Sequence, residues 1–321
     1  MTANDFPTPY RIAVLIPCFN EALTIGRVVQ EFHTALPGGT IFVYDNNSTD
    51  ETIKMARQAG AIIRKVRHQG KGNVLRRMFA DIEADIYVLV DGDDTYDAAS
   101  APKLVELLIM EQLDMVVGTR FGNYEEAAFR SGHHFGNHLL TSFVGLIFER
   151  SFTDMLSGYR VFSRRFVKSF PALAKGFETE TELTVHALEL RMPIAEVMTD
   201  YKSRPAGSVS KLHTYRDGYR ILRMILTLFR EERPLTFFSI LFAILSFASI
   251  TLALPLFFTY LETGLVPRFP TAILSTGLML LAFLNLGAGL ILDTVTKGRM
   301  EKKRLAYLSI PAIGSAGRQT E

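Results

Sequence analysis

Short apolar runs alternate with amphipathic segments over roughly the first 230 residues, a pattern typical of strands that alternate with helices. The runs are short and are followed by polar or turn-forming residues. The predicted buried strands cover residues 12–17, 40–45, 61–66, 86–91 and 115–118, and the predicted helices cover 23–35, 50–58, 71–82 and 101–111. This alternation predicts right-handed β-α-β units and a mainly parallel sheet, and therefore an α/β fold.

Two much longer apolar runs follow, and they predict a different kind of structure. Residues 235–261 and 271–292 contain no Asp, Glu, Lys or Arg. Because about 20 apolar residues cross a hydrocarbon layer, we expect transmembrane helices at about 235–260 and 271–293. The Gly- and Pro-containing segment between them predicts a tight turn and an antiparallel hairpin. A buried helical hairpin in a soluble core is the alternative.

Basic residues flank the hairpin on one side and indicate its orientation. The flanking residues are Arg220, Arg223, Arg230 and Arg233 before it, and Lys297, Arg299, Lys302, Lys303 and Arg304 after it. The connecting loop holds only Arg268. By the positive-inside rule we expect an integral protein of the inner or plasma membrane with the catalytic domain and both termini in the cytosol. We expect no signal peptide, because Asp5 precedes an apolar run that is too short.

These patterns predict four segments along the chain. An α/β domain is expected over residues 1–212, an amphipathic interfacial helix over 213–233, the hairpin over 234–296 and a basic cytosolic tail over 297–321. Packing of the amphipathic helix against the α/β domain is the alternative to its lying at the membrane surface.

Charge and cysteine content exclude several function classes. The chain carries 35 Lys and Arg against 33 Asp and Glu, and this balance argues against a nucleic-acid binder. The single cysteine, Cys18, excludes a disulfide framework and any C-x-x-C metal or redox site. The phosphate-loop motif and a G-x-G-x-x-G turn after a strand are both absent, so the usual phosphate-loop nucleotidases and dinucleotide oxidoreductases are excluded.

Polar clusters follow three of the predicted strands, at residues 17–21, 45–50 and 91–94. Ligands of such sheets bind outside the carboxyl ends of the strands, so we expect the three clusters to form one site. Asp91, Asp93 and Asp94 repel one another unless a cation lies among them. A hard divalent ion commonly uses one or two carboxylates together with substrate phosphates, and Gly92 would allow a close approach.

In this order the three motifs resemble those of the GT-A-fold glycosyltransferases of family 2. The segments are IAVLIPCFNE at residues 12–21, DNNSTD at 45–50 and DGD at 91–93. More narrowly, the chain resembles the dolichol-phosphate mannose synthase-like, or polyprenyl-phosphate glycosyltransferase, branch. The resemblance covers about residues 10–230. It implies a Rossmann-like GT-A cytosolic domain with a mainly parallel sheet, followed by a two-helix transmembrane hairpin.

The resemblance implies a donor site at the three strand ends. Its first motif would line the base and sugar pocket, and its second would contact base or ribose. Asp91 and Asp93 would hold Mg²⁺ or Mn²⁺, and Asp93 would be catalytic. Thr95, with Asp94 beside it, stands where the family often has a third ligand. The residues assigned to the donor are Pro17, Phe19, Asn20, Glu21, Asp45, Asn46, Lys71, Asp91 and Gly92.

The resemblance also implies an acceptor site rich in cations. The segment 118–120 resembles a G-S-R element, 154–160 resembles D-x-x-S-G-[FY]-[RK], and 201–212 resembles a basic loop that ends in S-K-L. Arg204 of that loop would close over the diphosphate and acceptor as a second catalytic residue. The residues assigned to the acceptor phosphate are Arg120, Arg130, Arg204 and Lys211.

Three glutamates, Glu178, Glu180 and Glu182, lie within residues 176–183, where a helix is expected to begin. Glu178 and Glu182 would share one helix face. One of the three would contact sugar hydroxyls or orient a basic residue, and a solvated first helical turn is the alternative.

The expected function is inverting transfer of one sugar from a UDP- or GDP-sugar to a polyprenyl phosphate at the cytosolic membrane face. A phosphate monoester is already a nucleophile and needs positioning more than a base. The alternatives are a glycolipid synthase with a hydroxyl acceptor, for which Asp154 or Glu182 would be the base, and a membrane-anchored nucleotide-sugar scaffold. A processive synthase would need a Q-x-x-R-W motif, and the chain has no Trp. The expected partners are the donor, the lipid, the membrane and further copies of the chain, but not nucleic acid.

Overall fold

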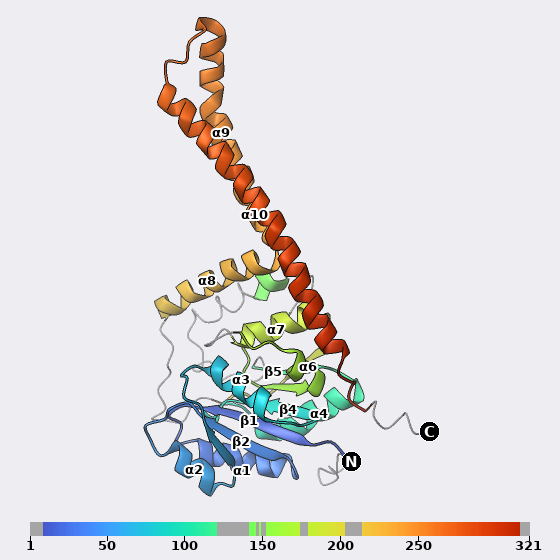
Figure 1. Ribbon diagram of the computed structural model, residues 1–321. Coiled ribbons are helices and arrows are strands. Elements are labelled where there is room, and N and C mark those ends of the chain that lie inside the picture. The colour runs from blue at the N-terminus through green and yellow to red at the C-terminus, as the bar shows by residue number, and fades with distance from the viewer. Residues whose placement is uncertain are drawn as a thin grey trace, which may run out of the picture. The chain divides into compact units, whose positions relative to one another are not determined.

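The computed structural model describes residues 9–120, 141–145, 148, 152–173, 179–202 and 214–314, and the chain divides into two units. The first unit comprises Met1–Tyr219 and Lys303–Glu321, and the second comprises Arg220–Lys302. The first is an α/β domain, and the second consists mainly of two long helices (Figure 1).

A single sheet of seven strands forms the centre of the first unit in its described part, in the order β3-β2-β1-β4-β6-β5-β7. The strands are β1 (Ile12–Cys18), β2 (Thr40–Asp45), β3 (Ile62–Lys65), β4 (Ile86–Leu89), β5 (Met115–Thr119), β6 (Arg160–Ser163) and β7 (Ile194–Met198). Only β6 runs against its neighbours β4 and β5, and every other pairing is parallel. The predicted mainly parallel sheet is confirmed.

Helices cover both faces of this sheet (Figure 1). One face carries α1 (Ile25–Ala35), α4 (Ala101–Met110) and the 3-10 turn η1 (Ala98–Ser100), with α2 (Thr52–Gln58) against α1. The other carries α3 (Lys71–Asp81) and α6 (Arg164–Ser169). Helix α7 (Thr179–Glu189) precedes β7. This three-layer arrangement explains why strands such as β1 and β4 are buried and apolar on both faces.

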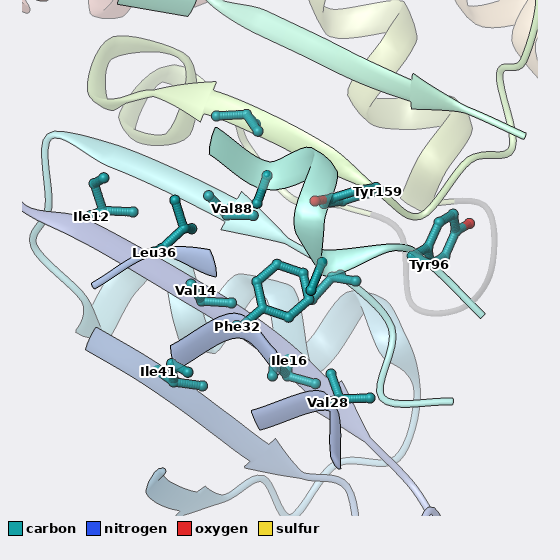
Figure 2. Close-up of a cluster of buried hydrophobic side chains, with 14 of the residues drawn as sticks. Ile12, Val14, Ile16, Val28, Phe32, Leu36, Ile41, Val88, Tyr96 and Tyr159 are labelled. Carbon is teal, nitrogen blue, oxygen red and sulfur yellow. The ribbon is translucent and has the colours of Figure 1, made fainter. Parts of the chain in front are cut away.

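Alternate residues of the central strands build the core on the α1 side (Figure 2). Val14 and Ile16 of β1 belong to the same buried cluster as Val28 and Phe32 of α1. The α1 pair follows the i, i+4 spacing of one helix face, whereas the β1 pair follows the period of two that a strand requires. The spacing of the apolar residues therefore determines which face of β1 packs against which face of α1.

The second unit contains α9 (Pro234–Thr263) and most of α10 (Phe269–Leu308), and most of α8 (Thr214–Glu232) precedes them. Both long helices are apolar enough to cross a membrane. They pack as a hairpin, with Ser249 Oγ donating to the carbonyl of Ser275 over 2.7 Å. Gly289 lies so close to Phe238 that an added Cβ would be 2.8 Å from the Phe238 Cβ. The turn begins at Gly264, whose φ of +67° is one that glycine adopts without strain.

The last turn of α10 belongs to the first unit, together with the chain that follows it. There Lys303 forms an ion pair with the fully buried carboxylate of Glu189 in α7. Tyr307 donates its hydroxyl hydrogen bond to Asp114 Oδ2 over 2.8 Å, and the Arg165 guanidinium lies 4.7 Å from the centre of the Tyr307 ring. Part of the segment expected as a basic tail is thus helical and packed against the α/β domain.

Candidate active site

The three polar clusters meet at the carboxyl edge of β1, β2 and β4, as the sequence pattern predicts. The backbone amide of Asn20 donates to Ser48 Oγ over 2.9 Å, and the amide of Thr49 donates to Asn20 Oδ1 over 2.8 Å. The amide of Glu21 donates to Thr52 Oγ1 over 2.9 Å. These crossed hydrogen bonds fix the first two clusters against each other. Pro17 and Phe19 are half-buried beside them.

Asn46 is the anchor of the loop that leads into α3. Its amide nitrogen donates to the carbonyl of His68 over 2.9 Å, and its Oδ1 accepts from the amide of Gly70 over 2.6 Å. Gly70 has a φ of +124°. The side chain of its neighbour Asp45 accepts from the amide of Ser48. Both residues shape the loops of the site, and their predicted contacts to base or ribose stay predictions.

Lys71 begins α3 and joins two carboxylates in the middle of the site. Its Nζ lies 2.5 Å from Asp91 Oδ1 and 2.5 Å from Glu180 Oε1. Burial by itself would lower the pKa of Lys71, but the charges of Asp91 and Glu180 outweigh it and raise that pKa. Gly158 lies against this group, where a Cβ would be 3.4 Å from Lys71 Nζ and would overlap the Asp91 carboxylate.

The D-G-D-D loop after β4 is held from several sides. Thr24 Oγ1 donates to the carbonyl of Gly92 over 2.7 Å, and an added Cβ on Gly92 would lie 2.7 Å from the Cys18 sulfur, so only glycine fits there. The hydroxyl of Thr95 donates to Asp93 Oδ1 over 2.6 Å. Asp94 has a left-handed φ of +59° and forms an ion pair with Arg27 of α1 over 2.8 Å.

These contacts bear on the predicted metal site. Asp91 and Asp93 offer carboxylate oxygens, which are the donors that Mg²⁺ and Mn²⁺ prefer. No group of three or more His, Cys, Asp or Glu residues that could hold a metal exists in the described part of the chain. Asp94 forms an ion pair with Arg27, and the Thr95 hydroxyl donates to Asp93. A bound ion would therefore take its other ligands from donor phosphates or water. The residues present fit such an ion.

The predicted acceptor side includes Arg120, which directly follows β5. Its guanidinium forms a forked pair with Asp154, both contacts being 2.7 Å long, and lies 5.8 Å from the centre of the Tyr201 ring. Burial alone would raise the pKa of Asp154, but Arg120 outweighs burial and lowers it. The Thr153 amide donates to Glu196 and holds this segment in place. Arg130, Arg204 and Lys211 lie outside the described residues.

A short bridge connects the D-G-D-D loop to the predicted acceptor side. Tyr96 pairs with Tyr201 in an isolated antiparallel bridge, and the amide of Lys202 donates to the carbonyl of Thr95 over 2.8 Å. The Tyr96 hydroxyl accepts from the amide of Gly158 over 2.8 Å. The backbone just after Asp93 is therefore hydrogen-bonded to residues 201 and 202, where the predicted basic loop begins.

From the sequence, Glu180 is only one of three candidates, and Arg160 lies in a matched element without an assigned contact. Glu180 forms an ion pair with Lys71, whereas Glu182 accepts from the amide of Leu173 over 2.8 Å, and Glu178 lies outside the described residues. Arg160 is fully buried and donates to the Met155 carbonyl over 2.6 Å and to Thr184 Oγ1 over 2.9 Å. Burial lowers the pKa of Arg160 to about 10. The glutamate spacing in E-T-E-T-E was visible in the sequence, but distinguishing Glu180 from Glu182 needed the geometry of α7.

Comparison with known proteins decides the family. Residues 13–170 match the model of glycosyl transferase family 2. Glycosyltransferase AglJ of Haloferax volcanii is 33% identical over 233 residues, which cover 72% of this chain and 76% of that protein. The chain belongs to glycosyltransferase family 2. The predicted GT-A fold and family are thereby confirmed.

Two further relatives of this family 2 glycosyltransferase extend the comparison. A dolichyl-phosphate hexose transferase of Haloferax volcanii is 27% identical over 222 residues, which cover 69% of this chain and 95% of that protein. Glucosyl-3-phosphoglycerate synthase from Mycobacterium tuberculosis, solved with Mn²⁺ and UDP-glucose, is 25% identical with a TM-score of 0.53. That likeness covers 69% of this chain and 78% of the synthase.

Proposed function

We propose that this family 2 glycosyltransferase transfers one hexose from a nucleotide-sugar to a polyprenyl phosphate, with inversion at the anomeric carbon. The observation that carries the proposal is the presence, in one chain, of a family 2 site and two helices apolar enough to span a membrane. The similarity to a dolichyl-phosphate hexose transferase supports a lipid phosphate as acceptor. The products would be a polyprenyl-phosphate sugar and a nucleoside diphosphate.

Asp91 and Asp93 would hold a divalent cation, and the Mn²⁺ in the similar synthase supports this role. Such an ion supplies Lewis-acid stabilisation of the leaving diphosphate when it is bound. Thr95 keeps one oxygen of Asp93 directed by a hydrogen bond, and Gly92 lets the loop pack tightly against Cys18. The chain's own contribution is to fix the geometry of two carboxylates before the donor arrives.

Arg120 would receive the acceptor phosphate through guanidinium N–H groups other than the two that donate to Asp154, because that pair holds the guanidinium plane in a fixed orientation. An oxygen of the acceptor phosphate attacks the anomeric carbon. The bond from that carbon to the donor phosphate oxygen breaks, and its electron pair remains on the nucleoside diphosphate. No proton needs to leave a dianionic nucleophile. The lowered pKa and the ion pair of Asp154 suit a partner of Arg120 better than a general base.

We further propose that the helices α9 and α10 anchor the enzyme with the catalytic unit and both termini in the cytosol. The basic residues that flank the hairpin support this orientation. A single-cysteine test is direct, because the native Cys18 is buried. Val266→Cys in the turn should react with an impermeant maleimide from outside intact cells. Reaction only after permeabilisation would contradict the orientation.

The transfer itself is tested with purified protein, a panel of UDP- and GDP-sugars, and either polyprenyl phosphate or neutral lipids, with Mg²⁺, Mn²⁺ or a chelator. Product on the phosphorylated lipid alone, lost with chelator and with Asp93→Ala, is the expected result. Product on a hydroxyl lipid would identify a glycolipid synthase instead. Tight nucleotide-sugar binding without turnover on any lipid would identify a scaffold.

A further inference from the structure

Lys71 forms an ion pair with Asp91, one of the two carboxylates that would bind the proposed cation. Its Nζ is 2.5 Å from Asp91 Oδ1, and a divalent ion at the same oxygen would place three positive charges within a few ångströms. Like charges at such separations repel strongly in a partly buried site. A divalent ion at Oδ1 of Asp91 would therefore compete with Lys71 for this contact.

Glu180 is a second partner that the Lys71 ammonium group already contacts, so neither backbone needs to move for the pair to form. Its Oε1 is already 2.5 Å from Nζ, and the glutamate is almost completely buried. Its other oxygen, Oε2, has no hydrogen-bond partner among the residues that the structure describes. An ammonium group has three donors, so Lys71 can donate to both oxygens of Glu180 once it leaves Asp91.

The alternative for Lys71 would be unfavourable. A lysine that lost Asp91 without another carboxylate would be a buried, unpaired cation, which is strongly destabilising. The charge balance also fits: Asp91, Asp93 and Glu180 against Lys71 leave a formal charge of −2, which one divalent cation neutralises. Without Glu180 the same group would carry only −1.

We propose that Glu180 is a positioning residue that takes over Lys71 when Asp91 turns to the divalent cation. Without the metal, Lys71 pairs with both Asp91 and Glu180. When the metal binds, Lys71 keeps only its pair with Glu180. The inference rests on the proposed metal dependence of the transferase. It assigns Glu180 a role through Lys71, with no direct contact to the reacting atoms.

The test measures binding of Mn²⁺ alone to the purified full-length chain by the loss of the free Mn²⁺ signal in electron paramagnetic resonance. Four proteins form a double-mutant cycle: wild type, Glu180→Gln, Lys71→Met and both together. Glu182→Gln is the matched control, because it removes the same charge from the same helix, and Glu182 accepts a hydrogen bond from the amide of Leu173.

Glu180→Gln should weaken Mn²⁺ binding by at least about fivefold in the wild-type background and by less than about twofold in the Lys71→Met background. Lys71→Met alone should strengthen binding, and Glu182→Gln should leave it unchanged. An equal effect of Glu180→Gln in both backgrounds would show a general charge effect and overturn the proposal.

Circular dichroism and gel filtration establish which variants fold. If Glu180→Gln does not fold, Lys71→Met decides alone, because a weaker Mn²⁺ affinity in that variant would overturn the competition. Failure of the proposed metal dependence looks different: the wild type would then transfer sugar in chelator and bind no Mn²⁺. Chelator-sensitive transfer with a failed cycle rejects only the role of Glu180.

Discussion

The hydroxyl of Thr95 donates a 2.6 Å hydrogen bond to Oδ1 of Asp93, and both side chains are buried. This hydrogen bond fixes the orientation of the carboxylate of Asp93, the second aspartate of D-G-D. The backbone carbonyl of the same threonine accepts from the amide of Lys202, so one residue joins the carboxylate to the acceptor side.

Removing that hydroxyl should impair the reaction more than the fold. Thr95→Val keeps the size and branching of the side chain but removes the hydroxyl that donates to Asp93 Oδ1 over 2.6 Å, and leaves that oxygen the longer 3.3 Å contact from the Thr95 amide. We expect turnover to fall by about tenfold, the scale typical of lost partners of metal-binding carboxylates. Thr95→Ser restores the donor and should recover most of the activity. Initial rates at saturating substrates test this, and equal rates for Thr95→Val and wild type would contradict it.

Much of this site followed from the sequence, because parallel strands end at one edge and polar residues followed three of them. The meeting of the loops around Asn20 and Ser48 needed only that topology. What could not be foreseen was the antiparallel β6, which begins with the buried Arg160. It inserts between β4 and β5 and carries Gly158 to Asp91, a long-range contact that no local pattern encodes.

The same limit applies to ion pairs across the fold. In E-T-E-T-E, helical spacing predicts that Glu178 and Glu182 share one helix face, but it does not say which of the three glutamates faces the site. The choice of Glu180 depends on how α7 is rotated. Arg160 bonds to Thr184 of that helix, so its rotation is fixed by a residue 24 positions earlier in the chain.

Arg120 is expected to act through its fork as well as its charge. Arg120→Lys keeps the charge but loses the paired contacts to Asp154, so the acceptor KM should rise by about tenfold while the donor KM changes little. Arg77→Lys is the control, because Arg77 forms an exposed ion pair with Asp81. Steady-state kinetics with each substrate varied in turn give both constants. A rise confined to the donor KM would contradict the assignment of Arg120 to the acceptor.

His186 should make the enzyme sensitive to mild acid. Burial, aided by the nearby charge of Lys303, lowers its pKa from 6.5 to about 3. Its folded pKa lies below its unfolded value, so the unfolded chain binds more protons between these values and stability falls as the pH falls below 6.5. The loss from this group alone should be on the order of 2 kcal/mol by pH 5.

The measurement compares melting temperatures in detergent at pH 7 and pH 5. His186→Gln can keep a hydrogen bond to Ser169, which lies 3.1 Å from His186 Nε2, but cannot take up the proton. The difference in melting temperature between the two pH values should be smaller in this variant than in wild type. His33→Gln is the control, because His33 is exposed. An unchanged pH response in His186→Gln would refute the buried neutral imidazole.

Tyr307 should stabilise the α/β domain although it lies at the end of the second long helix. Its hydroxyl donates to the fully buried Asp114, which also accepts from Ser163 and Arg165. Tyr307→Phe keeps the ring under the Arg165 guanidinium and removes only the hydrogen bond. The free energy of unfolding should fall by roughly 1.5–3 kcal/mol, the usual scale for a hydrogen bond to a charged group.

The matched control for this change is Tyr260→Phe, because Tyr260 is an exposed residue of α9. Melting temperatures are measured by differential scanning fluorimetry in detergent. We expect a value a few degrees lower for Tyr307→Phe and an unchanged value for Tyr260→Phe. Equal melting temperatures for all three proteins would mean that the last turn of α10 is not held by Asp114. A lower value for Tyr307→Phe makes the chain end part of the catalytic unit, so the unit is joined to the hairpin by two covalent connections.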